Sequence, residues 1–370
     1  MMKKLAVSLL SFGIILGAAV SAEAADKDEM PVYEQVQSKT LENSHGKVVN
    51  QEDSCLSRKK GTCLRKGDCI GVVAPASTAG ENIDELWKTV KFLKGLGYKV
   101  KISKAAKTAD ADFYGGHYKR CAEEFKKMFS DDNIKAIVCL RGGYGSMCML
   151  DELKEEDFDI ISRHPKLFIG YSDITAVHNV LGERCGLVTI HGPMMLSVLK
   201  GSYLTLDEFE KGIRGTTARV PEMEKKNIAA VYTGAAEGRL VGGNLSMLAA
   251  TCGTPYELNG DGGILFIEEI GEDGYRIDRM LRQLYENGLL SRVRGIAYGS
   301  FTDCSSEPGE PKIEEILAYY AKLAGKPAIR GIPAGHGDKN MFLPLGVRVK
   351  IHADESGEGV LEFLEDYAKK

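Results

Sequence analysis

The sequence lacks the short motifs that mark the common metal and cofactor enzymes. Its 370 residues contain no H-E-x-x-H, no EF-hand loop, no Walker A glycine loop and no G-x-G-x-x-G. The strict G-x-S-x-G of the α/β-hydrolases is missing as well. Its cysteines form no C-x-x-C pair, which leaves zinc ribbons and thioredoxin-type redox sites without support. We therefore predict neither a cofactor nor a metal site.

An excess of charge of one sign is also absent. The chain has 48 Lys and Arg against 52 Asp and Glu, a net charge of −4, and no basic block. An electrostatic footprint for nucleic acid is therefore missing. Hydrophobic residues are 44% and charged residues 27%, the composition of a soluble globular protein rather than of a disordered chain or a membrane bundle. At about 150 residues per domain, the length suggests two domains.

Long apolar runs are scarce, with one exception at the N-terminus. Lys3 and Lys4 precede an apolar run over 5–20, and Ala22-Glu23-Ala24 follows it. A positive segment, an apolar segment and an Ala-x-Ala site are the three parts of a secretory signal peptide. We expect residues 1–24 to be removed, leaving no membrane span, and the protein to be exported to the periplasm, cell wall or medium. Residues 25–66 are polar and are predicted to form an N-terminal extension.

Export permits disulfides, and nine cysteines are available, an odd number. The cluster Cys55, Cys63 and Cys69 is the place where we expect one. The other cysteines stand in or near apolar runs and are predicted to be buried thiols.

Beyond the extension, short apolar runs alternate with segments of helical spacing, which predicts an α/β fold with a parallel sheet. We expect a Rossmann-like nucleophile domain over 67–205 and a smaller, strand-rich α/β domain over 237–370. Between them, over 206–236, the pattern weakens and an interdomain segment is predicted. A strand that ends in a loop is expected within 70–77. Further strands are expected at 98–102, 134–140, 166–169, 238–241, 264–267 and 295–301, and a hairpin at 347–352 and 359–364. Helices are expected at 83–93, 118–129, 174–181, 243–251, 276–285 and 313–323.

Two strand–turn–helix junctions carry a serine. The first runs from the 134–140 strand through Arg141-Gly142-Gly143-Tyr144-Gly145 to Ser146, and its glycines allow the sharp turn that would expose a nucleophile. The alternative is that Ser146 is only a helix cap. The second junction ends in Ser172 and Asp173, for which capping of the following helix is the favoured interpretation.

A serine nucleophile needs a base and an orienting carboxylate. Among the seven histidines, His336 stands between two glycines on a predicted loop, where it is free to face a nucleophile. His191, before a Gly-Pro pair, is the second choice. The strand over 264–267 leads into Glu268 and Glu269, which point to opposite sides, and the sequence does not choose between them.

These residues resemble the LD-carboxypeptidase family of serine peptidases, which includes murein tetrapeptide carboxypeptidases and microcin C immunity peptidases. The matching stretches occur in order between about 69 and 352: VVAPAS (72–77), RGGYGS (141–146), GYSD (170–173), HGPM (191–194), GGNL (242–245), LFIEE (265–269), YRIDR (275–279), GSFTDC (299–304) and GHG (335–337). The family often has Asp where this chain has Glu269, and its murein-recycling members work in the cytoplasm, unlike an exported protein.

The resemblance implies a serine protease-type hydrolase with a Ser-His-Glu triad, which falls on Ser146, His336 and Glu268. The substrate would be a peptidoglycan stem tetrapeptide, cut before its terminal D-alanine in a cleft between the two domains. The backbone amides of Gly143 and Met147 are candidate oxyanion donors. Family members are commonly dimers, so a homodimer is expected.

Several polar residues are candidates for binding this substrate. The free carboxylate of the peptide calls for a cation, and Arg141, Arg239 and Arg276 are equally ranked. Asn244 could hydrogen-bond the peptide backbone, and Asp173 is a further candidate. Two alternative functions stay open: an amidase acting on peptidyl- or aminoacyl-nucleotides, as in microcin immunity, and a non-catalytic muropeptide-binding protein.

Overall fold

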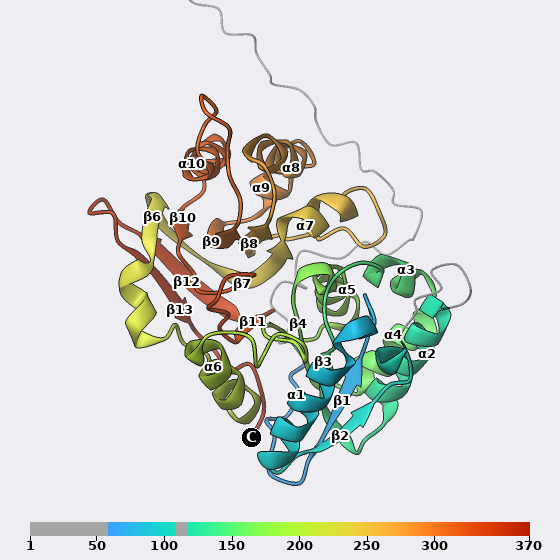
Figure 1. The fold of residues 1–370 in the computed structure, drawn as a ribbon. Helices are drawn as coiled ribbons and strands as arrows, with labels where there is room; N and C mark the ends of the chain where they lie inside the picture. The colour runs from blue at the N-terminus through green and yellow to red at the C-terminus, as the bar shows by residue number, and fades with distance from the viewer. Residues whose placement is uncertain (1–57, 109–116) are drawn as a thin grey trace, which may run out of the picture. The chain divides into compact units, whose positions relative to one another are not determined.

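The computed structural model describes residues 58–108 and 117–370. They form a six-stranded first sheet and a seven-stranded second sheet, with helices packed on both (Figure 1). The predicted fold, a Rossmann-like α/β unit followed by a strand-rich α/β unit, is confirmed. The expected signal peptide and residues 25–57 of the extension lie outside the described residues. Within the described part of the chain, no helix is both long enough and apolar enough to cross a membrane.

The first sheet is parallel except at one edge. Its strand order is β11-β5-β4-β3-β1-β2, and β11 pairs antiparallel with β5. The strands are β1 (Cys69–Val73), β2 (Lys99–Ile102), β3 (Ile134–Cys139), β4 (Leu167–Gly170), β5 (Thr189–His191) and β11 (Leu343–Leu345). The helices between them are α1 (Ile83–Gly95), α2 (His117–Ser130), α3 (Ser146–Asp151), α4 (Glu155–Arg163) and α5 (Thr175–Cys185).

Both faces of this sheet are buried because successive side chains on a strand point to opposite sides. On β3, Ala136 and Val138 join the core cluster that contains Leu86 and Leu93 of α1. Ile137 and Cys139 instead join the cluster built with α2, α4 and α5. This explains why the strands read as continuous apolar runs, as parallel strands covered on both faces do.

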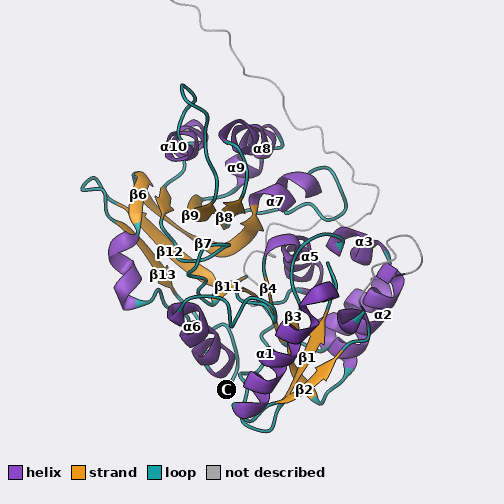
Figure 2. Ribbon diagram, in the orientation of Figure 1, coloured by secondary structure: helices purple, strands orange, loops and turns teal. Residues whose placement is uncertain are grey.

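The second sheet mixes parallel and antiparallel strands in the order β13-β12-β7-β8-β9-β10-β6. The strands are β6 (Ala229–Tyr232), β7 (Gly234–Asn244), β8 (Ile264–Ile270), β9 (Gly295–Thr302), β10 (Ala328–Arg330), β12 (Arg348–Ala353) and β13 (Gly359–Phe363). Its helices are α7 (Leu245–Thr251), α8 (Gly274–Glu286), α9 (Leu289–Arg292) and α10 (Ile313–Ala324). Figure 2 shows these helices gathered along one side of β8 and β9, where they share a core with both strands.

The segment 206–236 has more regular structure than its sequence pattern indicates. It contains most of α6 (Tyr203–Arg214), a 3-10 turn (Glu222–Asn227), β6 and the start of β7. Ser202 caps α6 by accepting a hydrogen bond from the Thr205 amide, and Phe209 and Ile213 are buried. Charged residues separate these apolar positions, so the helical spacing cannot be recognised in the sequence.

The described cysteines are all free thiols. The expectation of a disulfide within the N-terminal cluster is therefore wrong for Cys63 and Cys69, while Cys55 lies outside the described residues. Cys121, Cys139 and Cys185 are buried, as predicted, whereas Cys148, Cys252 and Cys304 are only half-buried, and for them the prediction is wrong.

The loops that leave the first sheet at its carboxyl edge carry most of the chemistry-bearing residues. The strand order reverses between β1 and β3, so the loops after these two strands diverge and leave a crevice, as in other open α/β sheets. The loops after β4 and β5 border the same edge. The residues that follow β1, β3, β4 and β5 are therefore the candidates for a functional site.

Candidate active site

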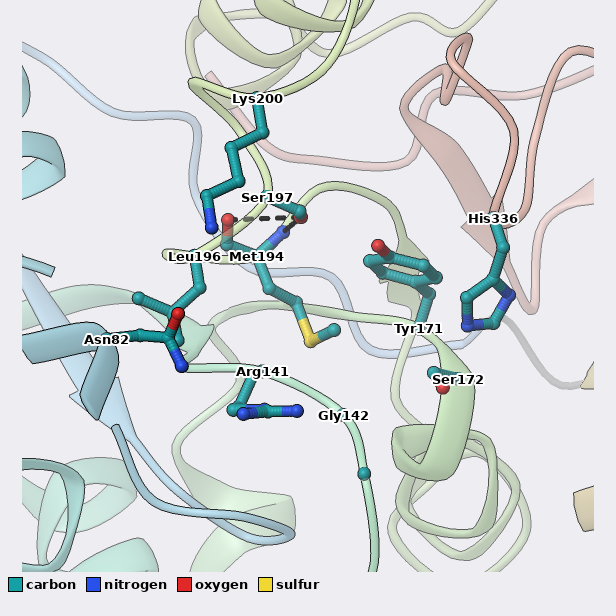
Figure 3. Close-up of a pocket in the computed structure, with 11 residues that line it drawn as sticks. Asn82, Arg141, Gly142, Tyr171, Ser172, Met194, Leu196, Ser197, Lys200 and His336 are labelled. Carbon is teal, nitrogen blue, oxygen red and sulfur yellow. Dashed lines mark hydrogen bonds between the residues drawn. The ribbon is translucent and has the colours of Figure 1, made fainter. Parts of the chain in front are cut away.

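A pocket of about 310 Å³ lies at this edge. It is bounded by the loops after β3, β4 and β5, by a 3-10 turn (Gly80–Asn82) and by the loop before β11. Eleven residues line it: Asn82, Arg141, Gly142, Gly143, Tyr171, Ser172, Met194, Leu196, Ser197, Lys200 and His336. Figure 3 shows His336, Tyr171 and Ser172 together on one side of this pocket.

His336 and Glu268 form a hydrogen-bonded pair. The loop between β10 and β11 carries His336, and its Nδ1 lies 2.7 Å from Oε2 of Glu268 on β8. Gly335 has φ +125, and a Cβ there would lie 2.7 Å from Glu268 Oε2. Only glycine therefore lets the loop come this close to the carboxylate.

Glu268 is fully buried but remains ionised. Burial raises the pKa of a carboxyl group, yet the interactions of Glu268 with His191 and then with His336 outweigh it, so that the Glu268 pKa is lowered to about 2. The charged carboxylate can therefore orient the imidazole and stabilise its protonated form.

Glu269 faces away from the pocket, which settles the choice that the sequence left open. Its carboxylate accepts hydrogen bonds from the Asn244 side chain and from the amide and hydroxyl of Ser246. Asn244 also caps α7 by accepting from the Met247 amide at 3.2 Å. Asn244 thus holds α7 against β8 and does not line the pocket, so its predicted contact with the substrate has no support from the pocket.

Ser146 is not exposed to the pocket, so the exposed position that was predicted for it is wrong. Its side chain is 0% exposed, and its Oγ donates to the Asp173 carbonyl oxygen at 2.6 Å. Gly143 and Gly145, with φ of +117 and +119, turn the chain so that Ser146 points inward, away from His336. The amide of Met147, whose oxyanion role depended on Ser146, does not border the pocket either.

Asp173 is likewise directed inward. Its Oδ2 accepts from the Ser146 amide at 2.9 Å, so the carboxylate binds the start of α3. Burial raises the Asp173 pKa, and the two hydrogen bonds from Ser146 oppose that effect. Asp173 therefore joins the loops after β3 and β4 and is a structural residue rather than a substrate ligand.

Ser172 has the features expected of the nucleophile. It follows β4 directly, lines the pocket with His336, and begins a short 3-10 turn (Ser172–Ile174) that leads into α5. Its φ is +66, a backbone conformation that residues other than glycine rarely adopt. A strained serine on a sharp strand-to-helix turn is the geometry of a nucleophile elbow.

Gly142 runs directly past this serine. A Cβ on Gly142 would lie 2.8 Å from Ser172 Oγ and 3.5 Å from the Asp173 amide nitrogen. Gly142 and Gly143 both line the pocket, so their backbone borders the space beside the hydroxyl, and the Asp173 amide directly follows the serine. These are the groups that could stabilise an oxyanion formed there.

The three candidate arginines separate clearly. Arg141 lines the pocket, and Figure 3 shows it with Lys200 across the pocket from His336. Arg239 instead donates to the Gly346 carbonyl oxygen and to Glu365. Arg276 is exposed and pairs with Glu272 and Asp273. Of the three predicted substrate contacts, only that of Arg141 is therefore supported by the lining of the pocket.

Four polar side chains in the pocket were not candidates in the sequence analysis: Asn82, Tyr171, Ser197 and Lys200. Tyr171 adjoins Ser172, and its ring centroid lies 4.9 Å from that of His336. A search centred on Ser172 would have found it. Asn82 and Lys200 stand in polar segments that look like ordinary surface, so the sequence offers no signal for them.

Within the described residues, no group of three or more His, Cys, Asp and Glu side chains lies close enough together to hold a metal ion. The chemistry that the pocket offers is that of a hydroxyl, an imidazole with a buried carboxylate behind it, and two cations.

Comparisons with known proteins identify the family of the chain. Residues 70–192 match the model of the LD-carboxypeptidase N-terminal domain, and residues 237–351 match that of the LD-carboxypeptidase C-terminal domain. A probable murein peptide carboxypeptidase of Bacillus subtilis is 38% identical over 301 residues, 80% of this chain and 92% of that protein. The murein tetrapeptide carboxypeptidase of Pseudomonas aeruginosa is 30% identical, over 75% of this chain and 91% of that protein.

Solved structures show the same relationship. The muramoyltetrapeptide carboxypeptidase of Oxalobacter formigenes superposes with a TM-score of 0.68 at 27% identity, covering 81% of this chain and all of that one (100%). A microcin C7 self-immunity protein in its unliganded state gives a TM-score of 0.73 at 26% identity, over 84% of this chain and 100% of that one. The family models match most of each sheet, and these two sequence relatives align with 80% and 75% of the chain, which therefore belongs to the LD-carboxypeptidase family.

Proposed function

We propose that this protein is a serine LD-carboxypeptidase that removes the terminal D-alanine from peptidoglycan stem tetrapeptides, with Ser172 as its nucleophile. One observation carries the proposal: a serine with a strained backbone shares a pocket with a histidine that is hydrogen-bonded to a buried, ionised glutamate. The names of the relatives supply the substrate class. A protein that only binds muropeptides has no need for this constellation.

In the proposed reaction, Ser172 Oγ attacks the carbonyl carbon before the terminal D-alanine, and His336 Nε2 accepts the hydroxyl proton. Glu268 holds the Nδ1–H of His336 and stabilises the imidazolium. The amides of Asp173 and Gly143 stabilise the oxyanion. His336 then returns the proton to the leaving D-alanine amine, and water hydrolyses the acyl-enzyme by the same route.

The decisive assay is mass spectrometry of a purified stem tetrapeptide after incubation with the protein. Loss of one D-alanine is expected, with no cleavage of the tripeptide product. An aminoacyl-sulfamoyl-adenosine substrate tests the microcin-immunity alternative in the same assay. If the protein cleaves only the nucleotide substrate, its substrate class is that of the microcin-immunity alternative. The proposed serine chemistry would still hold in that case.

The cations across the pocket from His336 are proposed to bind the free carboxylate of the peptide. Arg141→Ala is expected to raise KM about 10- to 100-fold, because charge-assisted hydrogen bonds to a carboxylate contribute about 1.5–3 kcal/mol. Arg276→Ala, which removes an exposed arginine outside the pocket, is the control and should change neither constant. A tetrapeptide with a C-terminal carboxamide should bind poorly to the unmodified protein and be insensitive to Arg141→Ala. An equal loss on both peptides would exclude carboxylate recognition by Arg141.

In acid, the logarithm of kcat/KM should fall by one unit per pH unit, as it does when a single group takes up a proton. Protonation of His336 removes the base, whereas Glu268, with its pKa lowered to about 2, stays ionised above pH 4. The pH profile of kcat/KM between pH 4 and 8 measures this. A slope of two protons would show that a second group, Glu268 included, titrates in that range, and a flat profile would rule out a histidine base.

Two further proposals concern the whole protein. We propose export through the signal peptide over 1–24, so that the enzyme meets stem peptides in the cell wall, and assembly as a homodimer. N-terminal sequencing of the native protein should begin at Ala25, and light scattering should give twice the chain mass. A retained initiator methionine with all activity in the cytosol would return the enzyme to murein recycling.

A further inference from the structure

His191 is a buried titratable residue that the reaction above leaves without a role. It is the last residue of β5 and is 0% exposed. Its Nε2 lies 3.7 Å from Oε1 of Glu268, the carboxylate oxygen that His336 does not contact. Neither ring nitrogen of His191, nor Glu268 Oε1, has a hydrogen-bond partner among the described residues.

Such a set of buried atoms is unusual. Buried polar side-chain atoms in folded proteins nearly always have a partner, and a buried carboxylate oxygen without a donor is especially unfavourable. The two unsatisfied groups face each other at a distance only slightly longer than a hydrogen bond. Catalytic hydrogen bonds are often long in an empty site and shorten when substrate binds.

The surroundings of His191 leave Glu268 as its polar partner. Phe266 of β8 packs edge-on against the ring at a centroid distance of 5.1 Å, and the ring of Tyr171 lies at 5.7 Å. The same tyrosine ring touches His336. The aromatic rings thus fix the position of His191 and keep it in a water-poor environment.

The other titratable groups near His191 do not compete for this role. His178 of α5 hydrogen-bonds the Gly170 carbonyl oxygen with its Nε2, and burial lowers its pKa to about 3, so it stays neutral. Burial raises the pKa of Tyr171, which therefore also stays neutral. On β11, the neighbouring strand, the partner of His191 is Leu343. Glu268 and His336 are the remaining ionisable groups that face it.

We propose that His191 is a positioning residue for the catalytic pair: its Nε2–H donates to Glu268 Oε1 and so holds Oε2 in line with His336 Nδ1. The inference rests on the proposed function. It gives Glu268 one histidine on each oxygen, one from the first sheet and one from the loop before β11. β5 belongs to the first sheet and β8 to the second, so the contact between His191 and Glu268 joins the two sheets. It thereby fixes His336, which Glu268 orients, relative to Ser172 in the loop after β4.

The sign of the expected change follows from the charge on Glu268. Without a donor at Oε1, the carboxylate interacts more strongly with His336 and binds the imidazolium more tightly. His336 then takes up its proton at higher pH, and its orientation becomes less fixed. The turnover number should fall, while KM should change little because His191 does not line the pocket.

A matched pair of variants tests the proposal. The side-chain amide nitrogen of glutamine reaches roughly the place of imidazole Nε2, whereas that of asparagine reaches only the place of Nδ1. His191→Gln should keep kcat within about threefold, and His191→Asn should lower it about 10- to 100-fold with KM within about twofold. A residue that only fills space would give two variants of similar kcat. If the asparagine variant does not fold, His191→Phe, which keeps a ring but has no donor, replaces it with the same expectation.

A second readout does not depend on the substrate. An NMR titration of the His336 ring, assigned with His336→Asn, should show its pH midpoint raised by about half a unit or more in the asparagine variant and unchanged in the glutamine variant. Equal midpoints in both variants and the unmodified protein would overturn the role of His191. If the unmodified protein cleaves no tetrapeptide, the proposed function fails, and the titration still decides whether His191 acts on the pair.

Discussion

Ser172→Ala is expected to lower D-alanine release by about 10³-fold or more, the loss typical of removing the nucleophile from a catalytic triad. The hydroxyl lines the pocket with His336, and no other described serine combines that position with a left-handed backbone. The fold should persist, because alanine removes one half-buried oxygen and adds no volume. Steady-state kinetics with the stem tetrapeptide, together with a thermal melt of each variant, measure both effects.

Ser146→Ala is the matched control, and it should affect the stability of the protein more than its activity. It removes the hydrogen bond to the Asp173 carbonyl oxygen, which should cost about 1 kcal/mol in the free energy of unfolding. Activity should stay within about tenfold of the unmodified enzyme, because Ser146 only supports the loop that carries Ser172. A reversed pair of results, with the Ser172 variant active and the Ser146 variant inactive, would restore Ser146 as nucleophile.

Glu268→Gln should lower kcat by about 10²- to 10⁴-fold. A neutral amide cannot stabilise the imidazolium, and an amide NH2 facing Nδ1 favours the wrong tautomer of His336. The two side chains have nearly the same shape, so the site should keep its structure. Measurement of kcat and of the melting temperature separates the electrostatic loss from unfolding.

Glu269→Gln is the control for the loss of the negative charge at Glu268. Glu269 is equally buried and adjacent, but it binds Asn244 and Ser246 and has no contact with His336. Its replacement should lower the melting temperature and leave kcat within about tenfold. If the Glu269 variant loses more activity than the Glu268 variant, the orienting carboxylate has been assigned to the wrong residue.

The sequence was sufficient for the long elements and for His336 and Glu268, two members of the proposed triad. Strands such as β1, β3 and β8 are runs of β-branched and apolar residues, and their character is visible without tertiary information. His336 was recognisable because glycines flank it on a loop. In contrast, β5 and β11 have three residues each, too few to show a period, and they exist because the rest of the sheet offers them an edge.

The choice between the two serines could not be made from sequence. Both follow a buried strand and precede a helix, so the local pattern is the same. What separates them is backbone geometry: the positive φ at Gly143 and Gly145 turns Ser146 inward, whereas the positive φ falls on Ser172 itself at the second junction. Dihedral angles of this kind are set by packing between loops distant in sequence. The orientation of Glu268 and Glu269 depends similarly on the irregularity in the β8–β9 pairing next to Glu268.

The pairing of β11 with β5 has a consequence for the order of folding. β11 (Leu343–Leu345) forms the edge of the first sheet, and the other strands of this sheet all precede residue 192 in the chain. The next residues, Gly346 and Val347, form backbone hydrogen bonds with Leu240 of the second sheet. The edge of β5 therefore stays open during synthesis until about residue 345 has emerged, some 150 residues later, and contacts of such long sequence separation form slowly. Pro344 lies in this outermost strand, where a missing amide hydrogen costs nothing in pairing. The nascent chain cannot bring His336 to Ser172 before nearly all of it has been made, so a product truncated before residue 336 carries Ser172 without His336.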